Sequence, residues 1–368
     1  MALTDKLTTI ANAIRSKTGK SDALTLDQMA TEIESISAGG GSTEEWIGDG
    51  NTHIWIILGE GRTSPMLGVC PNGTVTVDWG DGTTPDTLTG TSTSTVVWTP
   101  THDYAAPGDY MITLTASGTM GFAGDPEIAE LSCILRKSST SILPDRVYLN
   151  AIRRIEIGKN VVLTNDEVFA GCYSLTSVYI PSSVEDTGEK IFSSCNSLKS
   201  VTLPSNLPSI RPNTFRYCFS LTTANIPNSV KAIGEGAFKN CYTLTSVDIP
   251  YGVRSIESEA FMSCEALTSA NIPSSVMSIG YRAFYGCETL LSVHIPSGVT
   301  SIGNMAFCGC YSLVFCDFTN HTTVPTLSSA ETFSGIPTDC EIRVPAALYD
   351  QWIAAEYWSS LTSNIVAV

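Results

Sequence analysis

The stretch LTSVDIPYGVRSIESEAFMSCEA, residues 244–266, decides the fold, because its pattern returns along more than half of the chain. Written generally, the pattern is L-x-x-V-x-I-P-x-x-V-x-x-I-G-x-x-A-F-x-x-C-x-x, a unit of 23 residues. A fixed period of about 20–29 residues is the signature of a solenoid of stacked layers. The phenylalanine of the unit recurs at this spacing as Phe169, Phe192, Phe215, Phe238, Phe261, Phe284 and Phe307.

One unit can be interpreted as one layer of such a solenoid. Val247 and Ile249 alternate with Asp248, which predicts a short strand with both aliphatic side chains facing inward. Pro250 then ends the strand, because proline cannot donate a hydrogen bond to a sheet. A single layer cannot enclose these side chains, but layers stacked ~4.8 Å apart form a continuous core.

The array extends beyond the clear repeats at both ends. Ile155 and Ile157 match the register ahead of the first clear unit, so we expect the array to begin before residue 155. Cys316 and Phe318 occupy the valine and isoleucine positions of a last, degenerate layer. The tail, residues 345–368, has the pattern of an amphipathic helix, and we expect it to cap the exposed end, because terminal layers need caps for solubility.

Residues 150–345 resemble the BspA-like class of bacterial leucine-rich repeats. The motif is carried almost without departure by LTSANIPSSVMSIGYRAFYGC at 267–287. The ending VPAALYDQW, residues 344–352, is similar to the closing segment of that family. The resemblance implies a surface or secreted protein that acts in adhesion and host interaction.

The first 37 residues predict a helical hairpin with one apolar stripe on each helix. So short a segment cannot bury a core unaided, which predicts self-association or docking onto a larger particle. The segment resembles the openings of tail and baseplate proteins of bacteriophages of Gram-positive hosts, and this resemblance implies a trimer. The stripes comprise Leu3, Leu7, Ile10 and Ile14 in the first helix and Leu26, Met29, Ile33 and Ile36 in the second.

A different pattern follows a Gly-rich linker at 38–45 and runs to residue 124. Strand-length runs with period 2, among them TVTVDW at 74–79 and YMITLTA at 110–116, predict a small β-sandwich. The W-G-D-G sequence at 79–82 resembles the polycystic-kidney-disease-type (PKD-type) immunoglobulin-like domain. That resemblance implies a spacer, a stalk or a weak glycan- or protein-binding module.

Charge and hydropathy exclude several classes of partner. With 20 basic and 36 acidic residues the net charge is −16, which argues against nucleic acid. No apolar run approaches the ~20 residues needed to span a bilayer, and the first 20 residues have no recognisable signal peptide. We therefore expect no membrane insertion, and a protein that is made in the cytoplasm and acts on a virion tail or at the cell surface.

Seven of the twelve cysteines are explained by the repeat, in which one cysteine follows the core phenylalanine by three residues. We interpret these residues as buried free thiols that behave as small apolar side chains. A tighter group has ligand types suited to zinc, but its members hold different positions in the repeat, so we do not expect a metal site. This group is Cys308, Cys310, Cys316 and His321.

Asp78 and Asp81 flank a Trp-Gly turn in the predicted sandwich. Acidic loop oxygens can bind calcium, but Asp-Gly is also the ordinary pair of a tight hairpin, which we favour. No catalytic motif such as G-x-S-x-G or H-E-x-x-H occurs in the chain. The sequence therefore predicts a protein that is not an enzyme and needs no cofactor.

The outward side of the solenoid strands is the candidate ligand-binding face. One column is nearly uniform in serine and threonine, as hydroxyls bonded along neighbouring strands would be. The next column is mixed, and solenoids bind ligands along faces that stacking does not constrain. A mixed column is also what unconstrained solvent-facing positions look like. The column comprises Tyr179, Thr202, Asn225, Asp248, Asn271, His294 and Asp317.

The chain is thus predicted to be a multidomain, mainly β binding protein. By this interpretation it is a phage or prophage tail protein that binds a receptor on bacterial cells. A BspA-like surface adhesin for a host protein or glycan is the alternative, and an accessory module of a carbohydrate-active system is the third. The predicted segments are the hairpin (1–37), the linker (38–45), the sandwich (46–124), the solenoid (125–344) and a helical cap (345–368).

Overall fold

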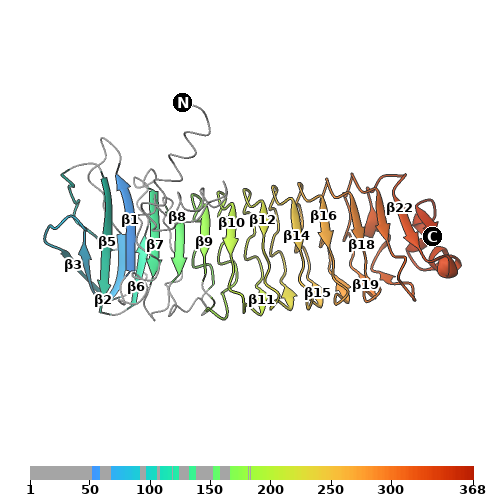
Figure 1. Cartoon of the computed structure of the whole chain (residues 1–368), viewed down its shortest axis with the longest axis horizontal. Helices are drawn as coiled ribbons and strands as arrows, with labels where there is room; N and C mark the ends of the chain where they lie inside the picture. Colours follow the sequence, from blue (N-terminus) through green and yellow to red (C-terminus); the bar gives the residue numbers. More distant parts are fainter. Residues whose placement is uncertain are drawn as a thin grey trace, which may run out of the picture.

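The computed structural model describes residues 52–58, 68–91, 97–105, 108–117, 119–123, 132–137, 152–157, 166–180, 182 and 184–368. The predicted hairpin and linker lie outside these ranges. Figure 1 shows an elongated molecule whose strands run across its long axis, from the first strands (blue) to the C-terminal layers (red). The described part is mainly β, and none of its helices is long and apolar enough to cross a bilayer.

The first ladder of the solenoid consists of short parallel strands, one from each layer. In β14 (Ser246–Asp248), Val247 is buried while Ser246 and Asp248 are exposed, as the repeat predicts. The first three strands of this ladder are β8 (Ile152–Ile157), β9 (Ser177–Tyr179) and β10 (Ser200–Thr202). The others are β12 (Thr223–Ala224), β14, β16 (Ser269–Asn271), β18 (Ser292–His294), β20 (Phe315–Asp317), β22 (Glu341–Val344) and β23 (Ile365–Ala367).

A second parallel ladder follows the proline corner of each layer. Its strands have only two residues, and each buries an aliphatic side chain at the second position. They pair in chain order to form a separate sheet. The strands are β11 (Ser209–Ile210), β13 (Ala232–Ile233), β15 (Ser255–Ile256), β17 (Ser278–Ile279), β19 (Ser301–Ile302) and β21 (Thr326–Leu327).

Turns form the remaining side of each layer, and we call this the turn side. Two residues per layer have left-handed backbone angles there, for example Glu259 (φ 58°) and Ser263 (φ 57°). With this geometry every second N–H group points along the solenoid axis. The N–H groups of Glu259, Phe261 and Ser263 accordingly donate to carbonyl oxygens of the next layer, those of Tyr281, Ala283 and Tyr285, at 2.7–2.8 Å.

The interior between the ladders is filled by columns of identical side chains. The phenylalanine rings stack from Phe169 to Phe333, with centroids 5.3–5.8 Å apart. The ladder cysteines are buried and free, which confirms their role as core residues. From Cys195 onward each ladder thiol donates to the phenylalanine carbonyl of the preceding layer, as Cys264 does to Phe238 at 3.2 Å. The cysteine column therefore fills space in the core and also supplies hydrogen-bond donors to the phenylalanine carbonyl oxygens.

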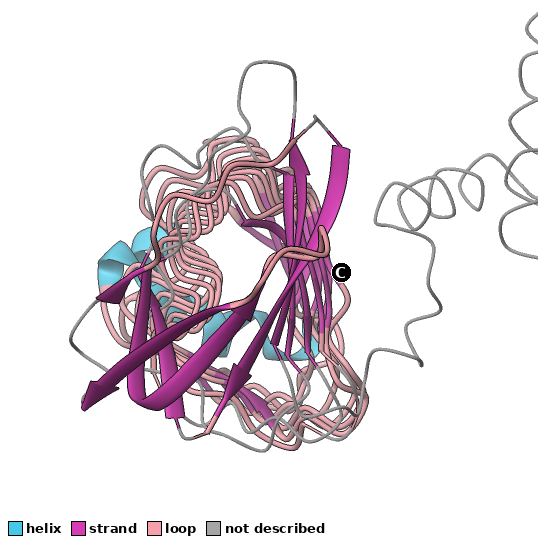
Figure 2. Cartoon of the chain, turned by 90° about the vertical axis from the view of Figure 1, so that its left-hand side faces the viewer, coloured by secondary structure: helices cyan, strands magenta, loops and turns pink. Residues whose placement is uncertain are grey.

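Among the described residues, the strands of the predicted sandwich (β1 to β6) and the first strands of the solenoid belong to one sheet. β7 (Ser132–Lys137) pairs antiparallel with β1 (Thr52–Leu58) and parallel with β8, so it belongs to both parts. Figure 2, viewed from the sandwich end, shows the layers superimposed behind the sandwich strands. β2 (Gly68–Asp78) is long enough to pair with four strands: β3 (Asp86–Thr91), β4 (Val97–Trp98), β5 (Gly108–Ala116) and β6 (Thr119–Ala123).

The C-terminal tail differs from the single amphipathic helix that the sequence predicts. It contains a 3-10 turn, η3 (Ala346–Leu348), a helix of six residues, α3 (Tyr349–Ala354), and a second 3-10 turn, η4 (Trp358–Leu361). Left-handed Tyr357 (φ 65°) separates α3 from η4. The chain then returns as β23, which extends the first ladder by pairing with β22. The end of the solenoid is thus covered by short turns that leave room for one more strand.

Candidate functional site

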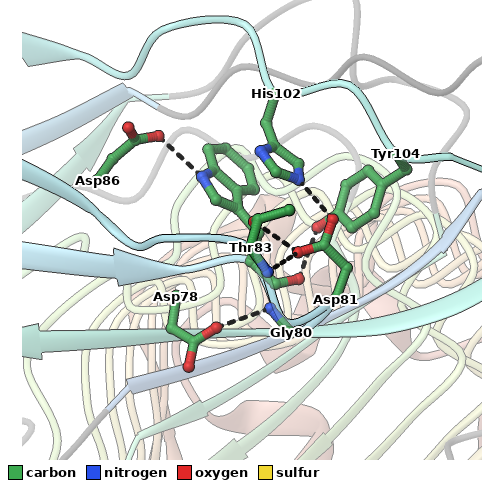
Figure 3. A network of polar contacts seen from close by, with 8 residues as sticks. Asp78, Gly80, Asp81, Thr83, Asp86, His102 and Tyr104 are labelled. Carbon is green, nitrogen blue, oxygen red and sulfur yellow. Dashed lines mark hydrogen bonds and ion pairs between the residues drawn. The ribbon is translucent and has the colours of Figure 1, made fainter.

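A polar network surrounds Trp79 in the sandwich (Figure 3). The Trp79 Nε1–H donates to Asp86 Oδ2 at 2.8 Å, and the Tyr104 hydroxyl donates to the Trp79 carbonyl at 2.8 Å. The His102 ring stacks on the indole, with centroids 4.5 Å apart and planes 6° from parallel. Because Trp79 and Tyr104 are buried, the network fastens the turn after β2 to the core.

The two candidate calcium ligands serve this turn. Asp78 Oδ1 accepts from the Gly80 N–H at 2.9 Å, and Asp81 Oδ1 accepts from the N–H and hydroxyl of Thr83 at 3.0 and 2.6 Å. Burial raises the pKa of Asp81, but the hydrogen bonds from Thr83 and His102 outweigh it and lower this pKa to about 2. Among the described residues no three acidic, histidine or cysteine side chains are grouped to hold a metal. The arrangement supports the tight-turn interpretation.

Gly80 explains why this turn is built on Trp-Gly. Its φ of +78° lies in the left-handed region, and a Cβ there would collide with the backbone carbonyl of Met111 in β5. A larger residue would push the turn away from β5 and separate Trp79 from its partners. The network is therefore a structural device of the sandwich.

The strand face, defined as the outward side of the first ladder, aligns the seven predicted binding residues in one column. Tyr179 pairs in register with Thr202, Asp248 with Asn271, and His294 with Asp317. All except Asp317, which is half-buried, are exposed. The column therefore exists as a surface feature, and ligand binding by it remains a prediction.

Two of these residues interact directly. His294 Nδ1 lies 3.0 Å from Asp317 Oδ2, a hydrogen-bonded contact between adjacent strands. Burial raises the pKa of Asp317, but hydrogen bonds from Thr319 and His294 outweigh it and hold this pKa below its usual range. Arg343 follows Asp317 in register on β22. Polar and charged side chains therefore follow one another along three neighbouring strands.

The strand face departs from its repeat at the C-terminal end. In the middle layers the first outward position is threonine, and the hydroxyls of Thr245 and Thr268 donate to the preceding layer at 3.2 and 3.1 Å. The next two layers have Leu291 and Val314 at this position, with exposed fractions of 50% and 57%. Phe315 replaces the serine of the second column, and the Arg343 guanidinium lies 4.1 Å from its ring centroid.

We call this surface the C-terminal patch and define it by six residues. Sequence analysis identified two of them as binding candidates but missed the other four. Three of these four could have been identified from the sequence, because they interrupt the threonine and serine columns of the repeat. Arg343 lies outside the repeat, and only strand pairing brings it there. The patch comprises Leu291, His294, Val314, Phe315, Asp317 and Arg343.

The cysteine and histidine group near residue 310 does not form a binding site. His321 is buried, its Nε2 lies 3.1 Å from the Ile295 carbonyl, and desolvation lowers its pKa. Cys310 belongs to the buried ladder, Cys308 is half-buried, and Cys316 contacts Cys340 instead. These residues are parts of the core and its margin.

Comparison with known proteins places the solenoid among leucine-rich repeats. The family model described as BspA type leucine rich repeat region matches in six copies over residues 130–245 and 208–336. No curated protein matches the chain. A leucine-rich repeat protein from T. pallidum is 29% identical, with a TM-score of 0.38 and coverage of 52% of this chain and 86% of that one.

Two further solved structures are similar to the chain. A leucine-rich repeat protein from Bacteroides ovatus is 25% identical, with a TM-score of 0.38 and coverage of 64% of this chain and 75% of that one. The pneumococcal vaccine antigen PcpA is 17% identical, with a TM-score of 0.32 and coverage of 59% and 78%.

Proposed function

We propose, because the chain belongs to the BspA-type leucine-rich repeat family, that it is a non-enzymatic protein that recognises a cell-surface ligand through the strand face of its solenoid. Solenoids of this type are typical of surface adhesion and binding proteins. The observation that carries the proposal is the C-terminal patch. Its residues face outward, so stacking does not constrain them, and several of them differ from the residues that the repeat has at these positions.

The composition of the patch supports binding to a macromolecule. Leu291 and Val314 expose apolar surface beside an arginine stacked on Phe315. Aromatic and arginine side chains dominate the binding energy of protein interfaces, and apolar clusters rimmed by charge mark interaction sites. Here the rim consists of the hydrogen-bonded pair His294 and Asp317.

The role we favour within this class is that of a tail-associated receptor-binding protein of a phage or prophage. Its support is the opening segment, residues 1–37, which resembles phage tail and baseplate proteins. In this proposal the sandwich, which resembles a PKD-type domain, is a spacer between attachment and recognition. A bacterial surface adhesin is the second candidate, and family membership favours it.

A variant that restores the repeat tests the strand face. We expect Leu291→Thr, Val314→Thr and Phe315→Ser together to weaken binding to intact cells of a Gram-positive host panel by at least ~tenfold, because they remove an interface hot spot. Flow cytometry with labelled protein measures the binding. The melting temperature should stay within a few degrees of the parent value, since other layers carry these residues.

Lys199→Thr is the matched control, because it restores the same column outside the patch. It should bind cells like the parent protein. Equal binding by the triple variant would contradict the proposal for the patch. If the triple variant loses both binding and stability, the single variant Phe315→Ser is tested in its place. Binding by Phe315→Ser equal to that of the parent protein would also contradict the proposal.

The attachment role of residues 1–37 has a separate test. Two apolar stripes on so short a segment need a partner, and we expect light scattering to show an oligomer, a trimer as first choice. A chain starting at Glu44 should be a monomer. Leu7→Asp with Ile33→Asp should act like the truncation, because unpaired charges would be buried in the assembly. A monomeric full chain at micromolar concentration would refute self-association.

A further inference from the structure

A small hollow lies on the turn side of the solenoid, among turns rather than strands. Its volume is about 240 Å³, and residues of two neighbouring layers line it. Backbone hydrogen bonds hold the layers in register: the Gly171 N–H donates to Ser193 O at 2.8 Å, and the Ser194 N–H donates to Arg216 O at 2.7 Å. The hollow is therefore supported by stacked backbone and does not depend on a loose loop.

The hollow exists because two adjacent columns of the repeat are both small in these two layers. The first column carries small residues here and larger ones in the next four layers, whereas the second is small in most layers and Tyr217 is its large exception. Backbone geometry does not cause this difference, because Ser194 and Tyr217 share the left-handed conformation, with φ of 63° and 64°. The first column runs Ala170, Ser193, Arg216, and the second runs Gly171, Ser194, Tyr217.

An exposed aromatic ring forms one wall. Tyr173 has an exposed fraction of 51%, although burying a ring of this size would be favourable. The end of its ring lies 3.9 Å from the position that a Cβ of Gly171 would occupy. The ring therefore covers the glycine at the floor of the hollow and remains accessible to a ligand.

The other groups are polar, but their charges cancel. Lys190 Nζ lies 3.2 Å from Glu167 Oε1, and the hydroxyls of Ser193 and Ser194 complete the lining. Neighbouring Asp166 and Glu189 carry negative charge, and Arg211, which interacts with both, carries positive charge. An anionic ligand would therefore gain no net attraction there, whereas a neutral ligand rich in hydroxyl groups would find both donors and acceptors.

We infer that the hollow binds one neutral pyranose ring of a cell-surface glycan. The ring of Tyr173 would pack against the C–H face of the sugar, and the Lys190–Glu167 pair and serine hydroxyls would bond its hydroxyl groups. Pockets for drug-sized ligands have about 300–1,000 Å³, so this smaller volume suits a single ring. The inference goes beyond the proposed function, because it assigns a second binding site that is separate from the strand face.

The test measures saturation-transfer difference NMR of the full chain with free glucose, galactose, N-acetylglucosamine and N-acetylgalactosamine, and with glucuronic acid as the anionic comparison. We expect at least one neutral sugar to give a saturation-transfer signal and to bind with a Kd in the millimolar range. Glucuronic acid should give no signal. Tyr173→Ala should reduce the signal at least ~tenfold, because it removes the aromatic wall. Ser193→Arg with Ser194→Tyr should abolish it by filling the hollow with the residues that the third layer already accommodates.

Tyr311→Ala is the matched control, because Tyr311 holds the same column of the repeat and does not line the hollow. It should leave the sugar signal unchanged, and so should the triple variant of the C-terminal patch. No signal from any neutral sugar, or an equal signal from the filled variant, would overturn the inference. The patch variant keeps this test independent of the cell-binding experiment, so the two proposals can fail separately.

Discussion

Replacing Phe238 by alanine is expected to lower the free energy of unfolding by ~3–5 kcal/mol. The ring is fully buried and stacks between Phe215 and Phe261, with centroids 5.3 Å away on both sides. Its removal opens a cavity in the middle of the phenylalanine column. The neighbouring rings cannot close the cavity, because backbone hydrogen bonds fix the spacing of the layers. Urea unfolding followed by circular dichroism measures the loss.

The control for this cavity is a residue that the same layer exposes. Asp248→Ala removes an outward side chain from β14 and should change stability by less than ~0.5 kcal/mol. Ile249→Ala, one position further along, removes a buried side chain and should cost ~2–5 kcal/mol. Similar costs at 248 and 249 would contradict the inward and outward assignment of the strand.

Replacing Trp358 by alanine is expected to cost a similar ~3–5 kcal/mol, at the end of the solenoid. Its indole is fully buried, and its Nε1–H donates to the Pro325 carbonyl at 2.8 Å. The ring contacts Trp352, Phe318 and Phe333, with centroid distances of 4.6, 5.4 and 5.7 Å. Its loss would expose the core of the last layers to water. Urea unfolding measures the total effect.

Hydrogen exchange locates this effect within the solenoid. Amides of β20 and β22 should exchange faster in Trp358→Ala, and those of β12 should change little, because each layer contacts only its neighbours. Trp358→Phe keeps most of the ring but leaves the Pro325 carbonyl without its donor, so ~1–2 kcal/mol is expected. Uniform acceleration across all layers would refute the capping role of this residue.

The core of the solenoid was predictable because stacking imposes one environment on every repeat. A residue type that recurs every 23 positions must meet the same neighbours in each layer, as the phenylalanine and cysteine columns do. Alternation around Val247 also gave the correct inward and outward sides of the first ladder.

The second ladder and the sheet junction were not predictable in the same way. A strand such as Ser255–Ile256 has two residues, too few to show a period of 2. β7 carries no repeat motif, and its membership of both sheets depends on pairing with residues about 80 positions earlier. The tail was predicted as one amphipathic helix with Trp352, Tyr357 and Trp358 on it, but left-handed Tyr357 interrupts the helix.

The surfaces were predictable only in part. The mixed column of the strand face was predictable from the repeat, because the buried residues of each strand fix the register in which the outward residues align. Arg343 reaches the C-terminal patch only through the pairing of β20 with β22, which lies beyond the last clear unit. The hollow depends on small residues in two neighbouring layers. A motif search looks for particular residues, so it does not detect a place where large side chains are absent.

The direction of the interlayer hydrogen bonds has a mechanical consequence. Strands lie across the long axis and the bonds between layers lie along it (Figure 1). A pull between the two ends of the solenoid would therefore load the layer interfaces in series, so that the weakest one yields first. Each released layer of 23 residues would add up to ~75 Å of extended chain. Under tension the solenoid would lengthen in steps, so that a tethered particle and its target could separate considerably before the attachment breaks.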